Sequence, residues 1–172
     1  MTAKEIINEW CNNVFRERQQ NKVFPNTFFD GFEADILEIT KSGYSYEYEV
    51  KISRSDFFND AKKKRDFFKG RAVSMNKFDL LSSGNRVNYF YYIVPKDLIS
   101  VEEVPEFAGL EYVDISDVRY YNHEKGYYTK PKLFVSTVKV APKLTKDKFP
   151  IERILKCLES TYYRFHSNRV KS

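Results

Sequence analysis

Apolar residues recur every three or four positions in the first stretch of the chain, which predicts an amphipathic helix over Ala3–Gln20. Thr2 directly precedes this stretch and is a residue type that caps helix N-termini. The following segment, Asn21–Asp30, contains Pro25 and shows no regular pattern. We therefore expect the chain to begin with a capped helix and a loop.

Strand-like alternation comes next and predicts a β-hairpin. Its two strands are Glu33–Thr40 and Tyr44–Ile52, joined by a polar turn that contains Gly43. Side chains alternate along a strand, so Glu49 and Lys51 are expected on one face while the apolar residues between them take the other.

Helical spacing returns after the hairpin and predicts a second helix over roughly Asp56–Lys69, with Ser53 or Ser55 as its cap. The segment Lys69–Arg86 has little pattern and includes a turn-like run of serine, glycine and asparagine. It predicts a mobile insertion that closes over a substrate.

The second half of the chain predicts further strands. Asn88–Val94 is continuous aromatic and β-branched sequence, typical of a central buried strand, and Pro95 ends it. Additional strands are expected at Leu110–Ile115 and Leu133–Val140, with a short hairpin at Tyr120–Tyr128.

Pro150 opens a last predicted helix. Its large apolar residues recur at helical spacing and form one stripe: Ile151, Ile154, Leu155, Leu158, Tyr162 and Phe165. The complete order of elements predicts a single α/β domain with a mixed β-sheet flanked by helices.

Length and composition agree with one packed domain. The chain has 172 residues, of which 42% are hydrophobic and 17% aromatic, which excludes a disordered protein. No apolar run approaches the roughly 18 residues of a membrane span. Met1–Glu5 also lacks the apolar segment of a signal peptide. We expect a cytoplasmic protein without membrane contact.

Cysteine and histidine are scarce. Cys11 and Cys157 lie on the two terminal helices, and His123 and His166 follow no ligand spacing. Free core thiols are expected instead of a zinc site or a disulfide framework. A Cys–His nucleophile pair stays open, although no local pattern suggests one.

The net charge of +5 is concentrated in one segment. Ser53–Lys77 has eight basic residues against three acidic ones, whereas Asp97–Asp117 has seven acidic residues and no basic one. A basic stripe attracts a phosphate backbone. A solvated helix face rich in lysine is the simpler alternative.

Candidate chemistry lies on the hairpin. Asp35 precedes the run Glu49-Val50-Lys51 by fourteen residues. If the register brings Asp35 alongside Glu49, the two carboxylates can share a divalent cation, and Mg²⁺ prefers such oxygen ligands. Lys51 would then stabilise charge on a phosphate or hold the attacking water. Alternating charges are also common on a solvated strand face.

Several motifs, in their order and spacing, resemble the PD-(D/E)XK nuclease superfamily, in particular the MmcB-like DNA-repair proteins and their phage-borne relatives. The resemblance covers about Asn26 to Lys148. The motifs that carry it are Ala34-Asp35-Ile36, the run Tyr48–Phe57 with Asp60 and Lys62 behind it, Tyr89–Pro95, Val104–Leu110 and Ala141–Leu144. Ala34 stands where the superfamily commonly has proline, and the insertion Lys69–Arg86 is a further departure.

The resemblance implies a restriction-endonuclease-like core in αβββαβ order. It makes Asp35 and Glu49 the metal ligands together with the Val50 carbonyl, Lys51 the catalytic lysine, and Mg²⁺ or Mn²⁺ the cofactor. Candidates for polar groups around the site are Glu5, Glu9, Ser53 and Asp56. Candidates for nucleic-acid contacts are Arg54, Lys62, Lys63, Arg65 and Lys69.

The expected function is that of a metal-dependent nuclease that hydrolyses DNA in repair or in phage DNA metabolism. The main alternative is a DNA-binding or complex-forming module that keeps the fold without cutting. An RNA substrate is a third possibility, without a supporting motif. A homodimer, or a complex with repair or replication proteins, stays open.

Overall fold

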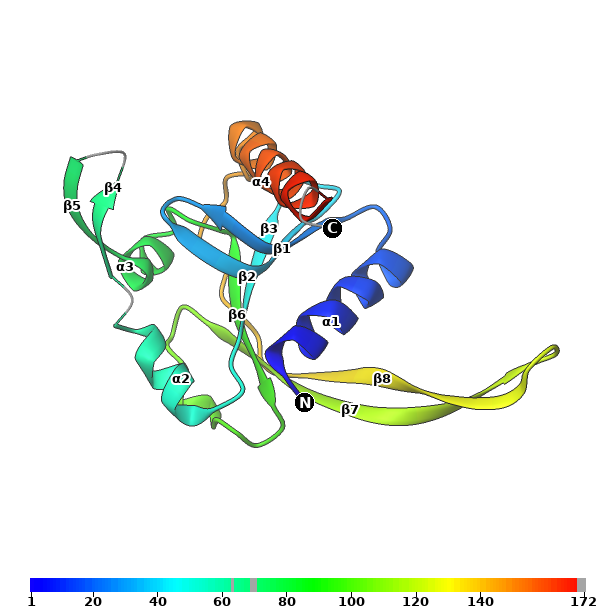
Figure 1. Cartoon of the computed structure of the whole chain (residues 1–172). Helices are drawn as coiled ribbons and strands as arrows, with labels where there is room; N and C mark the ends of the chain where they lie inside the picture. Colours follow the sequence, from blue (N-terminus) through cyan, green and yellow to red (C-terminus); the bar gives the residue numbers. More distant parts are fainter. Residues whose placement is uncertain (63, 69–70, 170–172) are drawn as a thin grey trace.

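The computed structural model describes residues 1–62, 64–68 and 71–169 (Figure 1). Its helices are α1 (Ala3–Glu17), α2 (Arg54–Asp60), α3 (Lys77–Ser82), the 3₁₀ helix η1 (Val101–Glu103) and α4 (Ile151–Arg169). Its strands are β1 (Lys22–Phe29), β2 (Phe32–Ile39), β3 (Ser45–Val50), β4 (Lys64–Phe68), β5 (Arg71–Asn76), β6 (Tyr89–Pro95), β7 (Gly109–Asn122) and β8 (Gly126–Lys139).

Six of the strands form one mixed sheet in the order β1-β2-β3-β6-β7-β8. The pairs β3–β6 and β6–β7 are parallel, and the others are antiparallel. Strands β4 and β5 form a separate two-stranded sheet beside this body (Figure 1). The predicted α/β fold with a mixed sheet flanked by helices is confirmed.

Each face of the six-stranded sheet has its own hydrophobic core. On one face, α1 packs Ile6 and Val14 into a cluster with Tyr48 of β3. On the other face, helices α2, α3 and α4 contribute to the cluster around Phe90 of β6, where Cys157 of α4 is fully buried. Because neighbouring residues of β3 point to opposite faces, Glu47 and Glu49 lie on the side of α2, α3 and α4.

The predicted hairpin and the predicted caps are confirmed. Strands β2 and β3 pair antiparallel, with Leu37 opposite Glu47. Thr2 closes a capping box at the start of α1. Ser53 caps α2 by accepting a hydrogen bond from the backbone N–H of Asp56. The central strand predicted at Asn88–Val94 is β6, which lies between β3 and β7.

The predicted loop at Asn21–Asp30 is wrong, because most of it is the strand β1. Pro25 suggested a loop, since proline cannot donate a ladder hydrogen bond. However, β1 is an edge strand, where this loss is tolerated. The adjacent Asn26 adopts a positive φ of 47°.

The predicted helix over Asp56–Lys69 is also wrong beyond its first five residues. Helix α2 ends at Asp60, and the chain continues as the hairpin β4–β5. The aromatic pair Phe67-Phe68 favours a strand. The predicted insertion Lys69–Arg86 is wrong as a patternless segment, because it contains the whole of β5 and the whole of α3.

The strands predicted at Leu110–Ile115 and Leu133–Val140 and the hairpin at Tyr120–Tyr128 belong to one long hairpin. Strands β7 and β8 pair over their full length, and Figure 1 shows them projecting from the body. Only the first part of β7 also pairs with β6, up to Val113 opposite Pro95. We call residues 114–134 the β7–β8 arm.

Helix α4 occurs where it was predicted, but its apolar stripe does not face the core. Cys157 is buried and Ile154 is partly buried, whereas Ile151, Leu155 and Leu158 are at least half exposed. None of the helices within the described residues is both long and apolar enough to cross a membrane.

Candidate active site

Asp35, Glu49 and Lys51 come together where the pairing of β2 with β3 stops. Ile36 opposite Tyr48 is the last pair, and Asp35 and Glu49 are the next residues along the two strands. An Asp35 carboxylate oxygen accepts a hydrogen bond from the backbone N–H of Val50 at 2.8 Å. Lys51 Nζ lies 2.9 Å from Glu49 Oε1.

The pKa of Asp35 reflects these neighbours. Burial raises it to about 6, with a further contribution from the negative charge of Glu49. The hydrogen bond from Val50 and the charges of Lys51 and Lys77 act in the opposite direction but do not compensate. A carboxyl group whose pKa is raised next to a second carboxylate is a common feature of functional sites.

A second lysine reaches the same carboxylates from α3. Asn76 caps this helix by accepting a hydrogen bond from the N–H of Phe78 at 2.8 Å, and Lys77 is the first helical residue. Lys77 Nζ lies 2.7 Å from Glu49 Oε2 and 2.9 Å from Glu47 Oε1. Burial lowers the pKa of Lys77, but the charges of Glu47 and Glu49 outweigh this effect, so that its pKa is raised.

Arg86 binds the far side of Glu47. Its Nε and Nη2 donate to the two Glu47 oxygens at 2.6 and 3.0 Å, in a bidentate arrangement. Its Nη1 and Nη2 also donate to the backbone carbonyls of Phe29 and Phe32, at the turn between β1 and β2. Arg86 therefore fixes Glu47 and also holds the turn that leads into β2.

Lys51 links Glu49 to Asp60 of helix α2. Its Nζ lies 3.0 Å from Asp60 Oδ1 of α2, and the Tyr92 hydroxyl donates to Asp60 Oδ2 at 2.9 Å. Burial, followed by the charge of Asp60, raises the pKa of Tyr92 far above its usual range. We call the six buried charged residues that are linked in this way the charge network: Glu47, Glu49, Lys51, Asp60, Lys77 and Arg86.

Two further candidates lie near the network. Ser53 caps α2. Asp56 is half exposed and has an oxygen 3.9 Å from Lys51 Nζ, so it stands between the network and solvent. Glu49 and Lys51 themselves are only 2% and 3% exposed.

Glu5 and Glu9 are not brought to the site. They belong to α1, which packs on the opposite face of the sheet from Glu49. Glu5 forms the capping box of α1, and both glutamates line a cavity next to Ile115 and Pro131 of the β7–β8 arm. The superfamily-like role of a glutamate on the first helix therefore has no support in this geometry.

The basic candidates are dispersed. Arg54 forms a bidentate ion pair with Glu103, and Lys62 donates to Asn59 on the exposed end of α2. Arg65 lies on β4 instead of the predicted helix, and its side chain lies outside the described residues. Lys63 and Lys69 also lie outside them.

Among the residues of this site, Asp35 and Glu49 are the pair of carboxylates that fits a hard divalent cation. Mg²⁺ keeps several waters and needs only one or two carboxylates, which Asp35 and Glu49 supply. Within the described residues, no group of three or more acidic, histidine or cysteine side chains is placed to hold an ion. Both Glu49 oxygens already accept from lysines, so a cation has to displace Lys51 or Lys77 from one of them.

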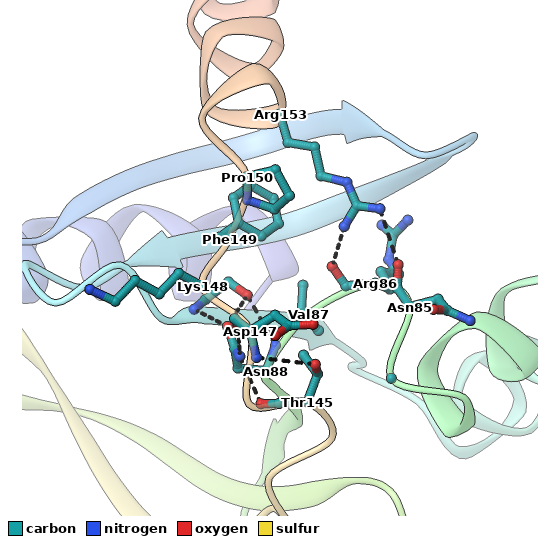
Figure 2. Close-up of a pocket in the computed structure, with 12 residues that line it drawn as sticks. Asn85, Arg86, Val87, Asn88, Thr145, Asp147, Lys148, Phe149, Pro150 and Arg153 are labelled. Carbon is teal, nitrogen blue, oxygen red and sulfur yellow. Dashed lines mark hydrogen bonds between the residues drawn. The ribbon is translucent and has the colours of Figure 1, made fainter.

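A cavity of about 180 Å³ is lined in part by Arg86 of the charge network (Figure 2). In it, the Asn88 amide donates to the backbone carbonyls of Thr145 and Asp147 at 2.9 and 2.7 Å. Arg153 donates to the carbonyls of Asn85 and Arg86, both at 3.1 Å. Figure 2 shows these bonds tying the segment before α4 to the residues before β6. The hydrogen bond from Arg153 thus holds the backbone of Arg86 in place.

Sequence reasoning missed Lys77, Arg86 and Asp60 as members of the site. Asp60 had a signal, since it lies four residues after Asp56 and thus on the same side of a helix. Arg86 stands alone between polar residues and the aromatic strand β6, and Lys77 is one of many lysines. Their roles depend on how α3 packs against β3, which no local pattern contains.

The chain matches no protein-family model, and no curated protein is similar to it in sequence. Among solved structures, it is similar to the SPO1766 protein of unknown function from Silicibacter pomeroyi, with a TM-score of 0.56 and 17% identity. That similarity covers 94% of this chain and 90% of the other. At this level of identity, the two proteins share an α/β fold with a six-stranded mixed sheet flanked by helices.

Proposed function

We propose that this protein has a restriction-endonuclease-like core and is a nuclease that hydrolyses DNA with the help of Mg²⁺ or Mn²⁺. The observation that carries the proposal is the meeting of Asp35, Glu49 and Lys51 on two neighbouring strands, where burial and Glu49 raise the pKa of Asp35. Two carboxylates and a lysine in this arrangement are suited to phosphodiester hydrolysis.

The order of elements supports the proposed core. Helix α1, the antiparallel strands β1, β2 and β3, helix α2 and the parallel strand β6 follow one another in αβββαβ order. The hairpin β4–β5 and helix α3 are inserted between α2 and β6. The two acidic motif residues lie on neighbouring strands of this core, Asp35 on β2 and Glu49 on β3.

The charges of the site define what each side chain does. A bound Mg²⁺ or Mn²⁺ would supply an activated water and stabilise charge on the phosphate. Asp35 and Glu49, with the Val50 carbonyl, would hold the ion. Lys51, released from Glu49, would donate to a phosphate oxygen, and Asp60 would keep its ammonium group in place. Asp56 lies between Lys51 and solvent.

A second function is favoured by a specific observation. The charge network is internally paired, and Glu49 is almost fully buried between two lysines. A DNA-binding or complex-forming module that keeps the fold without cutting would need only such a paired network and no metal site. In that case the network only stabilises the fold.

The test is cleavage of plasmid, duplex and single-stranded DNA in Mg²⁺, in Mn²⁺ and in EDTA. We expect cleavage with either metal and none in EDTA. Asp35→Asn should lower the rate about 100-fold or more, because a metal ligand contributes several kcal/mol. Glu33→Gln, two residues away on the same strand and exposed, is the matched control and should cleave within about twofold of wild type.

Binding of Mn²⁺ separates the two functions when no cleavage is seen. Calorimetric titration should show tighter binding to Lys77→Met than to wild type, because Glu49 Oε2 loses its competing lysine. Lys62→Met, which removes an exposed lysine, should leave the affinity unchanged. DNA binding without any Mn²⁺ binding in wild type or Lys77→Met would leave the non-cutting module as the function.

A further inference from the structure

The outer face of α4 carries large apolar side chains that nothing in the described chain covers. Ile151, Leu155, Leu158, Tyr162 and Phe165 are each between 50% and 61% exposed. We call these five residues the α4 seam. Isolated exposed apolar residues are ordinary, but a continuous patch of this kind marks an interaction surface.

The side of α4 that faces the body is a different one. Cys157 is buried in the core, Ile154 packs against it, and Arg164 donates to the Pro25 carbonyl of β1 at 2.8 Å. Arg153 forms an ion pair with Asp30 at 2.9 Å. These contacts fix the rotation of α4 about its axis, so the seam cannot turn inward. Figure 1 shows the helix lying over the β1 side of the sheet.

The spacing of the seam fits a second helix as its partner. The steps from Ile151 to Leu155, Leu158, Tyr162 and Phe165 are four, three, four and three residues. This is an unbroken heptad pattern, with a period of 3.5 residues, which keeps a stripe in register with a second helix.

We propose that the partner is a second copy of this chain, joined through an antiparallel pair of α4 helices. A two-fold pair covers both seams with one contact. Centred on Leu158, it places Ile151 opposite Phe165 and Leu155 opposite Tyr162 of the second copy. Each outer layer then combines one aliphatic and one aromatic side chain, so the layers have similar volumes. A parallel pair would stack the largest residues on each other.

The helix dipoles favour the antiparallel direction, whereas the charged residues beside the seam act in both senses. Exposed Glu152 and Glu159 flank the seam on the side away from the core, and His166 follows at the other end of the same flank. In the antiparallel pair, Glu152 lies beside His166 of the second copy, and the two copies of Glu159 lie beside each other, which is a repulsive contact. The helix dipoles run in opposite directions, which favours this pair.

The size of the seam predicts a dimer of moderate affinity. Five side chains of this type, about half exposed, present roughly 500 Å² per copy, which reaches the roughly 1,000 Å² total of a small specific interface. Dissociation in the micromolar range is therefore expected.

Sedimentation of the full chain over a wide concentration range tests the proposal independently of any nuclease activity. We expect a reversible monomer–dimer equilibrium. Leu158→Glu should raise the dissociation constant at least tenfold, whereas Tyr121→Glu on the β7–β8 arm, which is equally exposed, should not change it. A monomer at every concentration, or a dimer that Leu158→Glu leaves intact, would overturn the proposal.

Disulfide trapping tests the direction of the pair in a Cys11→Ser background. Leu155→Cys protein mixed with Tyr162→Cys protein should form a mixed disulfide, because these positions face each other across the antiparallel pair. Neither protein alone should dimerise covalently to a comparable extent. Efficient disulfide formation by Leu155→Cys alone would indicate a parallel pair and overturn the antiparallel one.

Discussion

Six charged side chains lie in the interior between β3, α2 and α3, whereas five large apolar side chains lie at the surface of α4. The two regions depart from ordinary burial in opposite directions. In the charge network, each carboxylate has a cationic partner within 3.0 Å. The α4 seam has no such compensation within the described chain. The network is therefore complete as folded, and the seam is incomplete until a second molecule covers it.

The difference shows where each region contributes free energy. Burial of six charges is costly unless every one is paired, so the network depends on all of its members. An exposed apolar residue costs little in the monomer, so the seam contributes mainly to association. Removing one residue should thus have a large effect on folding in the first region and a small one in the second.

Arg86→Met should have the largest effect on stability. It leaves Glu47 buried with only Lys77 as a partner and frees two carbonyls at the β1–β2 turn. We expect the free energy of unfolding, measured in urea, to fall by about 3–5 kcal/mol. Arg119→Met on the β7–β8 arm, which removes an exposed arginine, should change it by less than about 0.5 kcal/mol. Equal effects would mean that the network is not a stabilising unit.

Asp35→Asn should have an intermediate effect that depends on pH. The folded pKa of about 6 lies above the ordinary value, so the folded state holds the proton more tightly than the unfolded chain. The resulting stabilisation is present below about pH 4 and is lost as the pH rises to about 6. In EDTA, wild type should lose on the order of 1–2 kcal/mol relative to Asp35→Asn over this window, since Asp35 is partly exposed. The groups that face Asp35 are Glu49, Lys51 and Lys77. A constant difference between the two proteins would show that Asp35 is already ionised below pH 4.

Leu158→Gln should have the smallest effect on the monomer. At concentrations below dimerisation, its free energy of unfolding should stay within about 0.5 kcal/mol of wild type, because Leu158 is half exposed. Leu81→Gln, a fully buried leucine of α3, is the contrasting substitution and should cost several kcal/mol. A large loss for Leu158→Gln at low concentration would mean that the seam packs within one chain.

Local patterns were sufficient for several elements. Period-two alternation around Glu49 identified the β2–β3 hairpin, and Thr2 and Ser53 identified two helix starts. The same alternation placed Glu49 and Lys51 on one face of the strand. Whether Asp35 lies beside Glu49 depended on the hairpin register, which the turn sets. These features depend on residues that are close in sequence.

Other features were decided by tertiary structure. Pro25 is compatible with β1 only because that strand lies at the sheet edge. The apolar stripe of α4 has the pattern of a core-facing surface, but the side of the helix that carries Cys157 packs in the core instead. Lys77 and Arg86 reach the site only because α3 and the segment before β6 pack against β3. The sequence by itself determined the type of most elements and the motif on one hairpin, since both arise from neighbouring residues. Only the tertiary structure decided which charges are neutralised and which apolar face is left open, because both depend on contacts between residues distant in the chain.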